Sequence, residues 1–226
     1  MNMLKRNKIL AVPFKELFGF IKISNFFSLI FFTEITYNYY MVTRKQFDDY
    51  MMPVYNPAHF IPVKAKGSIV WDSKNKKYID FASGIAVTSL GHCYPPLVKV
   101  LNDQSKKIWH LSNAMTNAPA LNLAKTLCKH TFADKVFFAN SGAEAMEGAV
   151  KTARKYANQK YGKGKNQIVA FADAFHGRTM MTIALNGSER MTKGFGPMPS
   201  GIKHHPYNEI KGLDKVITKK TAAVVL

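Results

Sequence analysis

The sequence is poor in cysteine, in acidic residues and in long apolar runs, and each shortage excludes a class of protein. Cys93 and Cys128 are the two cysteines among 226 residues, so a disulfide framework is excluded, and their spacing fits no CxxC motif. We interpret both as buried small side chains of a protein in a reducing, cytoplasmic compartment. The seven histidines are scattered, and His204 and His205 are adjacent rather than spaced for one ligand face, so we predict no metal site.

Acidic residues are outnumbered, because 14 Asp and Glu stand against 32 Lys and Arg and give a formal net charge of +18. Such a charge raises the hypothesis of a nucleic-acid-binding protein. The lysines are dispersed, however, as Lys74, Lys76 and Lys77 illustrate, and no basic stripe with interleaved aromatic residues is present. We therefore interpret the basic residues as solvated surface that attracts anionic small molecules, and we expect no nucleic-acid partner.

The N-terminal residues 1–40 differ from the rest of the chain. They contain the apolar run GFIKISNFFSLIFF at residues 19–32, which Lys22 and several polar residues interrupt. The run falls short of the about 20 apolar residues that span a bilayer, and no small-residue cleavage site follows it. We predict that residues 1–40 are an extension of unclear status and that Met41 is the natural start. A degraded organelle presequence and a membrane anchor are the alternatives.

From Met41 onward the pattern predicts an α/β protein. Alternating apolar and polar residues around DSKNKK predict a hairpin within residues 67–84. Apolar periodicity predicts helices at 95–112 and 119–131. The first is expected to carry Leu97, Val100, Leu101 and Ile108 on one face, and the second to direct Leu121, Ala124, Leu127 and Cys128 inward. Short apolar runs predict strands at 135–140, 166–173 and 221–226 of a mostly parallel sheet. The chain stops on the last strand, so we expect it to be incomplete.

The stretch NSGAEAMEGAVKTARKYA at residues 140–157 predicts a helix with two uses for its first turn. Ser141 and Glu144 have the spacing of a capping box, in which each side chain bonds the other residue's backbone N–H. Capping alone explains this pattern. The first turn also directs free N–H groups and the positive end of the helix dipole outward, which suits a phosphate, and Gly142 would let such an anion approach the backbone closely.

The stretch DAFHGRT at residues 173–179 follows the next predicted strand, so we expect it beside the start of that helix. Phe175 could lie against a planar cofactor and Arg178 could form a fork with a substrate carboxylate. A core ring and a surface ion pair are the alternatives for these two residues. We interpret His176 as a hydrogen-bonded structural histidine.

Glycine-rich stretches flank these motifs. The loop at 81–96 contains Gly84 and Gly91 and is expected to pack closely against a neighbour. The stretch 194–208, rich in Gly and Pro, reads as a long loop that could border a site. GKGK at 162–165 lacks the spacing of a phosphate loop.

Taken together, these motifs resemble the class III aminotransferases that use pyridoxal phosphate. The resemblance covers residues 41–226 and is carried by the following stretches: MPVYNPAHFIPVKAKGS, DFASGIAVTSLGHCYPPLV, WHLSNAMTNAPALNLAKTL, NSGAEAMEGAVKTAR, AFHGRT and KGFGPMPSGIKHHPYN. It implies the type I pyridoxal-phosphate-dependent transferase fold in truncated form. Residues 41–115 would be the N-terminal segment and part of the small domain. Residues 116–226 would be an incomplete cofactor-binding large domain, with the first part of a mixed, mostly parallel sheet.

The resemblance also implies roles for individual residues. It places Ser141, Gly142 and Ala143 at the cofactor phosphate, Phe175 on the pyridine ring and Arg178 at the substrate α-carboxylate. Ala143 stands where Thr is frequent in the family, which loses a hydroxyl contact but keeps the backbone N–H. The lysine that forms the Schiff base and the aspartate that pairs with the pyridinium nitrogen have no counterpart here, so we assign no catalytic residue. Gly148 replaces a usual Ala, at a cost of up to about 1 kcal/mol of helix stability.

The resemblance is strongest to family members of arginine and lysine biosynthesis. It implies transfer of the terminal amino group of N-acetylornithine or succinyldiaminopimelate to 2-oxoglutarate by a cytoplasmic homodimer, and we expect the chain as given not to catalyse it. Ornithine or 4-aminobutyrate aminotransferase is one alternative. A non-catalytic remnant of a truncated gene, with an unfinished sheet edge, is a second, and a membrane-anchored protein is a third.

Overall fold

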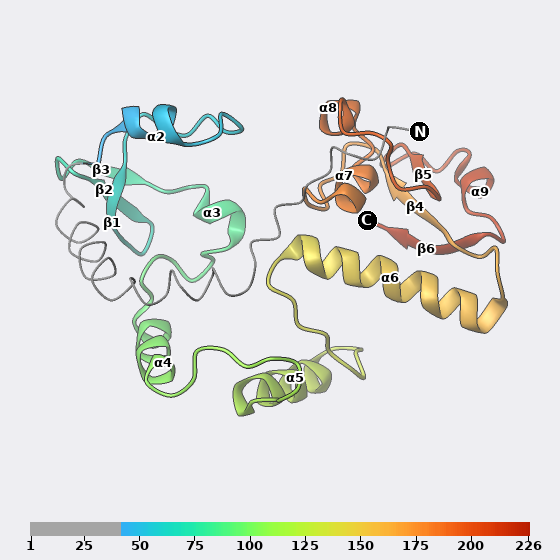
Figure 1. Cartoon of the computed structure of the whole chain (residues 1–226), viewed down its shortest axis with the longest axis horizontal. Helices are drawn as coiled ribbons and strands as arrows, with labels where there is room; N and C mark the ends of the chain where they lie inside the picture. Colours follow the sequence, from blue (N-terminus) through green and yellow to red (C-terminus); the bar gives the residue numbers. More distant parts are fainter. Residues whose placement is uncertain (1–41) are drawn as a thin grey trace, which may run out of the picture. The chain divides into compact units, whose positions relative to one another are not determined.

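The computed structural model describes residues 42–226, so the segment 1–40 and Met41 lie outside the described residues. The chain divides into two compact units after His110, and each unit is described by itself (Figure 1). Within residues 42–226, no helix is both long enough and apolar enough to cross a membrane.

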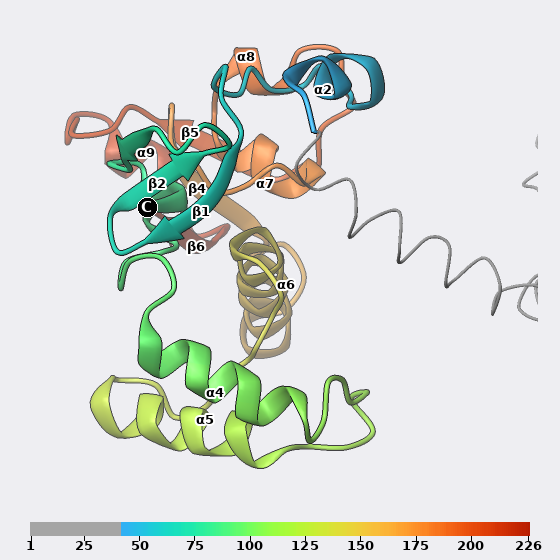
Figure 2. The ribbon, with the colours of Figure 1, turned by 90° about the vertical axis from the view of Figure 1, so that its left-hand side faces the viewer.

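Within its described residues, 42–110, the first unit contains a small antiparallel sheet and three helices. Its elements are α2 (Arg44–Tyr50), β1 (Pro62–Lys66), β2 (Ile69–Asp72), β3 (Lys77–Ile79), α3 (Ser83–Ala86) and α4 (Pro95–Ser105). The strands follow the order β1-β2-β3 and pair antiparallel, and Figure 2 shows β1 and β2 side by side. The pairing of β2 with β3 confirms the predicted hairpin.

Asp72 holds the turn of this hairpin. Its Oδ1 atom accepts hydrogen bonds from the backbone N–H groups of Lys74 and Lys76, both at 2.9 Å. Its Oδ2 atom accepts a third, from the Tyr78 hydroxyl at 3.0 Å. An aspartate that bonds the backbone two residues onward stabilises a turn, and this explains why the polar stretch between the two strands reverses the chain here.

Gly91 brings the predicted glycine-rich loop against β1 and β2. The backbone of His92 pairs with that of Gly67, and a Cβ atom at Gly91 would lie 3.0 Å from the Cα atom of Gly67. The expected close packing of this loop is therefore confirmed at Gly91. The His92 side chain adds a second tie, since its Nε2 atom lies 2.7 Å from Oδ2 of Asp80.

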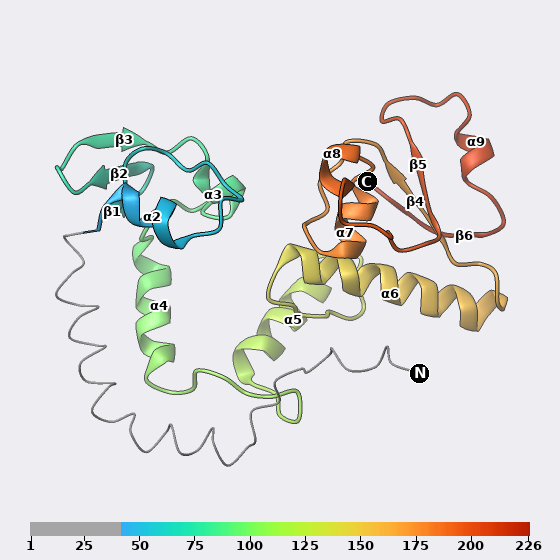
Figure 3. The same cartoon turned by 45° about the horizontal axis from the view of Figure 1, so that its top comes forward.

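The second unit is built around a parallel sheet. Its elements are α5 (Ala118–His130), α6 (Gly142–Tyr161), β4 (Gln167–Phe171), α7 (Met180–Leu185), α8 (Glu189–Thr192), β5 (Ile202–His205), α9 (Leu213–Val216) and β6 (Thr221–Val225). The strand order is β5-β4-β6, and β4 pairs in parallel with both neighbours. Helix α6 runs alongside this sheet (Figure 1, Figure 3).

The core of this unit lies between α6, α7 and the sheet. Val150 of α6, Ile168 and Ala170 of β4, and Leu185 of α7 form one buried cluster. Because Ile168 and Ala170 are two residues apart, they face the same side of the strand. Helix α6 contributes Val150 to this cluster, and its Ala157 is also buried.

Two strand assignments differ from the sequence-based ones. Residues 135–140 form no strand. A strand needs a hydrogen-bonded neighbour, and within residues 42–226 both edges of β4 are taken by β5 and β6. Phe137 instead packs its ring 3.2 Å from the position that a Cβ atom of Gly148 would occupy, which gives the unusual helix glycine a packing reason. Conversely, β5 lies within the stretch 194–208, which was predicted to be a loop.

The two predicted helices are confirmed as α4 and α5, but the inward face predicted for α5 is wrong at Leu121 and the apolar face of α4 is not buried. Leu97, Val100 and Leu101 of α4 are 54%, 63% and 67% exposed, and Leu121 of α5 is 56% exposed. The apolar periodicity is present, but no described element packs against these residues closely enough to bury them. The cysteines were also predicted to be buried, yet Cys93 is exposed and Cys128 is half-buried.

We predict that the stability of the first unit falls in acid through Asp80. The hydrogen bond from His92, with those from the backbone of Ser83 and Ala82, holds the pKa of Asp80 below its usual value. This stabilisation is fully present above the unfolded-state pKa, about 3.9, and is lost as pH falls through the lower folded-state pKa. Asp80→Asn should flatten this acid dependence.

Urea unfolding between pH 2 and pH 7, followed by tryptophan fluorescence, measures this effect, because Trp71 and Trp109 both precede the boundary after His110. Asp103→Asn, which removes an exposed carboxylate on α4, is the control and should keep the wild-type acid dependence. An Asp80→Asn protein with the wild-type pH profile would contradict the assignment.

Candidate functional site

The start of α6 and the loop after β4 meet directly. A Cβ atom at Gly177 would lie 2.8 Å from the Cβ atom of Ala143 and 3.1 Å from its Cα atom. Ala143 is in the first turn of α6, and Gly177 lies between Phe175 and Arg178 in the loop that follows β4. The structure therefore brings the two predicted clusters, 141–143 and 173–179, together at one place.

The first turn of α6 is capped, but not by the predicted reciprocal pair. Ser141 is extended, and its Oγ atom accepts a hydrogen bond from the Glu144 N–H at 3.2 Å, as predicted. The Glu144 carboxylate reaches one residue further back than predicted, to the N–H of Asn140 at 2.6 Å. The capping box is therefore wrong in its second half, because the chain before Ser141 curls so that Asn140 presents its N–H to the carboxylate.

This geometry leaves donors for an anion. The N–H groups of Gly142 and Ala143 are in the first turn, where the helix offers no carbonyl partner. The cap uses the Ser141 hydroxyl as an acceptor, so its proton is not engaged in that bond. A Cβ atom at Gly142 would meet nothing within 4 Å, so space lies open beside this turn. The positive end of the 20-residue helix faces the same space and favours a negative charge.

The loop after β4 presents an aromatic ring and a guanidinium beside that turn. Phe175 is 65% exposed, which excludes the alternative of a core ring, and Arg178 is also exposed. An exposed phenylalanine offers a flat apolar face to a planar ring, and a guanidinium offers paired donors to a carboxylate. The groups at this place therefore fit a ligand with a phosphate and a planar ring, together with a substrate that has a carboxylate.

Polar side chains of α6 and of the end of α7 hydrogen-bond the loop that follows β4. Asn186, fully buried at the end of α7, accepts a hydrogen bond from the His176 N–H at 2.6 Å and donates one to the Gly177 carbonyl at 3.2 Å. The Thr179 hydroxyl donates to Glu147 of α6 at 2.6 Å. The sequence did not single out Asn186, Glu147 or Thr179, because residues that bond the backbone of a distant loop leave no local pattern.

His176 is buried, but the prediction of a hydrogen-bonded histidine is wrong at one ring nitrogen. Its Nε2 atom has no hydrogen-bond partner within residues 42–226. Burial lowers the pKa of His176, so the imidazole is neutral at pH 7. No group of three or more His, Cys, Asp or Glu residues in the described part of the chain is placed to hold a metal ion.

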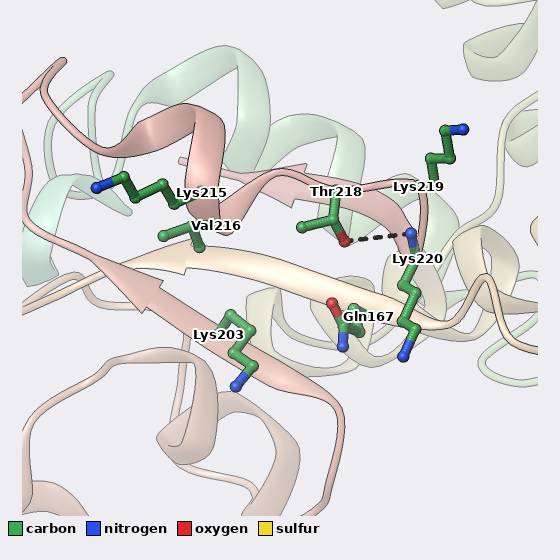
Figure 4. Close-up of a pocket in the computed structure, with 7 residues that line it drawn as sticks. All are labelled: Gln167, Lys203, Lys215, Val216, Thr218, Lys219 and Lys220. Atoms are coloured by element: carbon green, nitrogen blue, oxygen red, sulfur yellow. Dashed lines mark hydrogen bonds between the residues drawn. The ribbon is translucent and has the colours of Figure 1, made fainter.

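A basic pocket of about 590 Å³ lies near the N-terminal ends of the strands (Figure 4). It is lined by Gln167, Lys203, Lys215, Val216, Thr218, Lys219 and Lys220. Gln167 opens β4, whereas residues 172–179 follow the end of that strand. The pocket contains none of the predicted site residues and is separate from the place where Gly177 meets Ala143.

The chain belongs to the class-III aminotransferase family, whose model matches residues 50–226. The predicted family is thereby confirmed, and likeness to solved aminotransferases confirms the predicted type I fold. The chain is 54% identical over 186 residues to an acetylornithine/succinyldiaminopimelate aminotransferase of Buchnera aphidicola, a match that covers 82% of this chain and 46% of the relative. It is 55% identical over 185 residues to a succinylornithine transaminase/acetylornithine aminotransferase of Pseudomonas aeruginosa, with the same two coverages.

Among solved structures, the chain resembles the ornithine aminotransferase of Toxoplasma gondii, with a TM-score of 0.75 and 26% identity. That match covers 80% of this chain and 43% of the other, and the Toxoplasma structure has partial occupancy of pyridoxal phosphate at its active site. The chain therefore spans less than half the length of these relatives.

We predict that Gly177→Ala separates the loop from α6. Gly177 has φ of +127°, and an added Cβ atom would also lie 2.9 Å from Oγ1 of Thr182. Gly164→Ala is the control, because Gly164 has φ of +108° and open space around it. The control should cost about 1–2 kcal/mol from backbone strain, and Gly177→Ala should cost about 1–3 kcal/mol more from overpacking.

Urea unfolding followed by far-ultraviolet circular dichroism measures both variants. Equal losses of stability would contradict the close contact between the loop and α6.

Proposed function

We propose that this chain carries the cofactor-phosphate and substrate-carboxylate part of the active site of a pyridoxal-phosphate-dependent aminotransferase. The single observation that carries the proposal is the contact of Gly177 with Ala143, which sets an aromatic ring and an arginine beside a helix N-terminus. Family membership supports the same reading. In this proposal residues 116–226 are an incomplete cofactor-binding domain, and the complete enzyme is a homodimer.

Each residue has one task in this proposal. The N–H groups of Gly142 and Ala143, with the Ser141 hydroxyl, bind the cofactor phosphate. The Phe175 ring lies against the pyridine ring and excludes water from that face. Arg178 holds the substrate α-carboxylate through paired N–H donors. Pyridoxal phosphate, when bound, supplies the electron sink on which amino-group transfer depends.

The names of the relatives support a particular donor. Enzymes about half identical to this chain act, by name, on acetylornithine and succinyldiaminopimelate, so we propose transfer of the terminal amino group of such a donor to 2-oxoglutarate. The structural likeness to an ornithine aminotransferase, at lower identity, makes ornithine the second candidate. No residue of this chain is assigned to the lysine that binds the cofactor covalently, so we expect the chain by itself to bind cofactor without turnover.

Phosphate anchoring is tested with a matched pair of variants at Gly142. Proline is well tolerated at the first helical position, and the extended Ser141 before it is compatible with proline. Gly142→Pro therefore keeps the helix and removes one N–H donor, whereas Gly142→Ala keeps the donor and meets no atom within 4 Å. We expect Gly142→Pro to weaken the binding of pyridoxamine 5′-phosphate on the order of tenfold or more, as for one hydrogen bond to a charged group.

Calorimetric titration of the 226-residue chain measures this binding. Gly142→Ala should bind more tightly than Gly142→Pro because it keeps the N–H donor, and pyridoxamine without phosphate should bind far more weakly than pyridoxamine 5′-phosphate to the wild-type chain. A wild-type chain that binds pyridoxamine 5′-phosphate and pyridoxamine equally would contradict the assignment of the first turn of α6 as the phosphate site.

The donor is tested in a chimera that joins this chain to the remaining downstream residues of the Buchnera relative. We expect glutamate to form from 2-oxoglutarate with N-acetylornithine or succinyldiaminopimelate at a kcat/KM at least about tenfold above that with ornithine, because about 1.4 kcal/mol of differential binding gives that ratio. The relative itself is the positive control. A preference for ornithine would support the second candidate, and an inactive chimera beside an active relative would favour a non-catalytic remnant.

A further inference from the structure

Asn186 is tied to the scaffold and to the loop at the same time. It follows α7, and its own N–H donates to the Thr182 carbonyl at 3.1 Å. The neighbouring Leu185 belongs to the buried core and has no exposed surface. The side chain of Asn186 then bonds the backbone of His176 and of Gly177. These are the two residues between Phe175 and Arg178, so Asn186 fixes the segment that carries both side chains.

The hydrogen bonds at position 186 require a carboxamide side chain. The side chain must accept from one N–H and donate to one carbonyl in a site that is fully buried. An asparagine does both, a carboxylate is an acceptor only, and a leucine does neither. Because an unpaired buried polar group is costly, replacing Asn186 would release the loop rather than leave its backbone groups unbonded.

Two further contacts give the loop a fixed position against α6. The Thr179 hydroxyl bonds Glu147 of α6 at 2.6 Å, and Gly177 contacts Ala143 of the same helix. With Asn186 behind them, the backbone on both sides of Arg178 is held. Phe175 is exposed, so the place of its ring depends on the path of this backbone.

We propose that Asn186 is a positioning residue, which sets Phe175 and Arg178 at the height above the first turn of α6 that a cofactor ring and a substrate carboxylate require. The proposal rests on the function proposed above. The proposal distinguishes the contact with the cofactor ring from the contact with the cofactor phosphate. Asn186 acts on the ring contact through Phe175, whereas the phosphate contact depends on α6 and does not involve Asn186.

The experiment compares two ligands on the 226-residue chain, pyridoxamine 5′-phosphate by calorimetry and inorganic phosphate by ³¹P NMR titration. Asn186→Leu should weaken pyridoxamine 5′-phosphate binding on the order of tenfold and leave phosphate binding within about twofold of wild type. Asn158→Leu is the matched control, because Asn158 is exposed on α6, and it should change neither affinity.

Asn186→Asp supplies a rescue that a purely structural role would not show. An ionised aspartate places an oxygen against the Gly177 carbonyl, but a protonated carboxyl group has one O–H donor and one acceptor and mimics the amide. Burial raises the pKa of such a carboxyl group. Relative to wild type at the same pH, Asn186→Asp should therefore bind pyridoxamine 5′-phosphate more weakly at pH 8 than at pH 5.

The outcomes separate the two proposals. If wild type binds neither ligand, the proposed function of this chain fails, and the role of Asn186 falls with it. If wild type binds both ligands and Asn186→Leu weakens them equally or not at all, the function stands and the positioning role is overturned. Should Asn186→Leu not fold, hydrogen exchange in wild type decides, since a His176 amide that exchanges as fast as an unstructured loop would overturn the role.

Discussion

The candidate site depends on one place where two backbones approach more closely than side chains allow. Gly177 stands against Ala143 at a distance that no other residue type would permit without displacement. Its φ of +127° is also a conformation that L-residues with a side chain rarely adopt. Because of this contact, a helix N-terminus, an aromatic ring and an arginine share one small region. Without it the same residues would be an ordinary capped helix and an ordinary loop.

Under the proposed function, the same residues of helix α6 therefore cap the helix and bind the cofactor phosphate. Ser141 caps the helix by accepting from the Glu144 N–H, and the same extended residue exposes the first-turn N–H groups. The cap and the anion site do not compete, because the cap satisfies the third helical N–H and the anion would bind the first two. The Glu144 carboxylate accepts its hydrogen bonds from Asn140.

The sequence predicted local structure well and packing poorly. Helices α4, α5 and α6, the β2–β3 hairpin and strands β4 and β6 follow from apolar periodicity and turn residues, which act within a few positions. Strand β5 was missed because IKHH has weak strand propensity and depends on pairing with β4. Residues 135–140 were assigned to a strand on propensity alone, yet no described neighbour pairs with them. Likewise, periodicity marks an apolar face on α4 but does not supply what covers it.

The residues that we propose to face a ligand were singled out in the sequence, because the chemistry of a phosphate, a planar ring and a carboxylate calls for particular residue types. The residues that hold them, Asn186, Glu147 and Thr179, contact backbone or side chains distant in sequence. This division has an evolutionary consequence. Asn186 hydrogen-bonds main-chain atoms, so these bonds do not depend on which exposed side chains the loop carries. The exposed Phe175 could be exchanged for another residue at little cost to folding, and the ligand preference of the loop could diverge among relatives while its path stays the same.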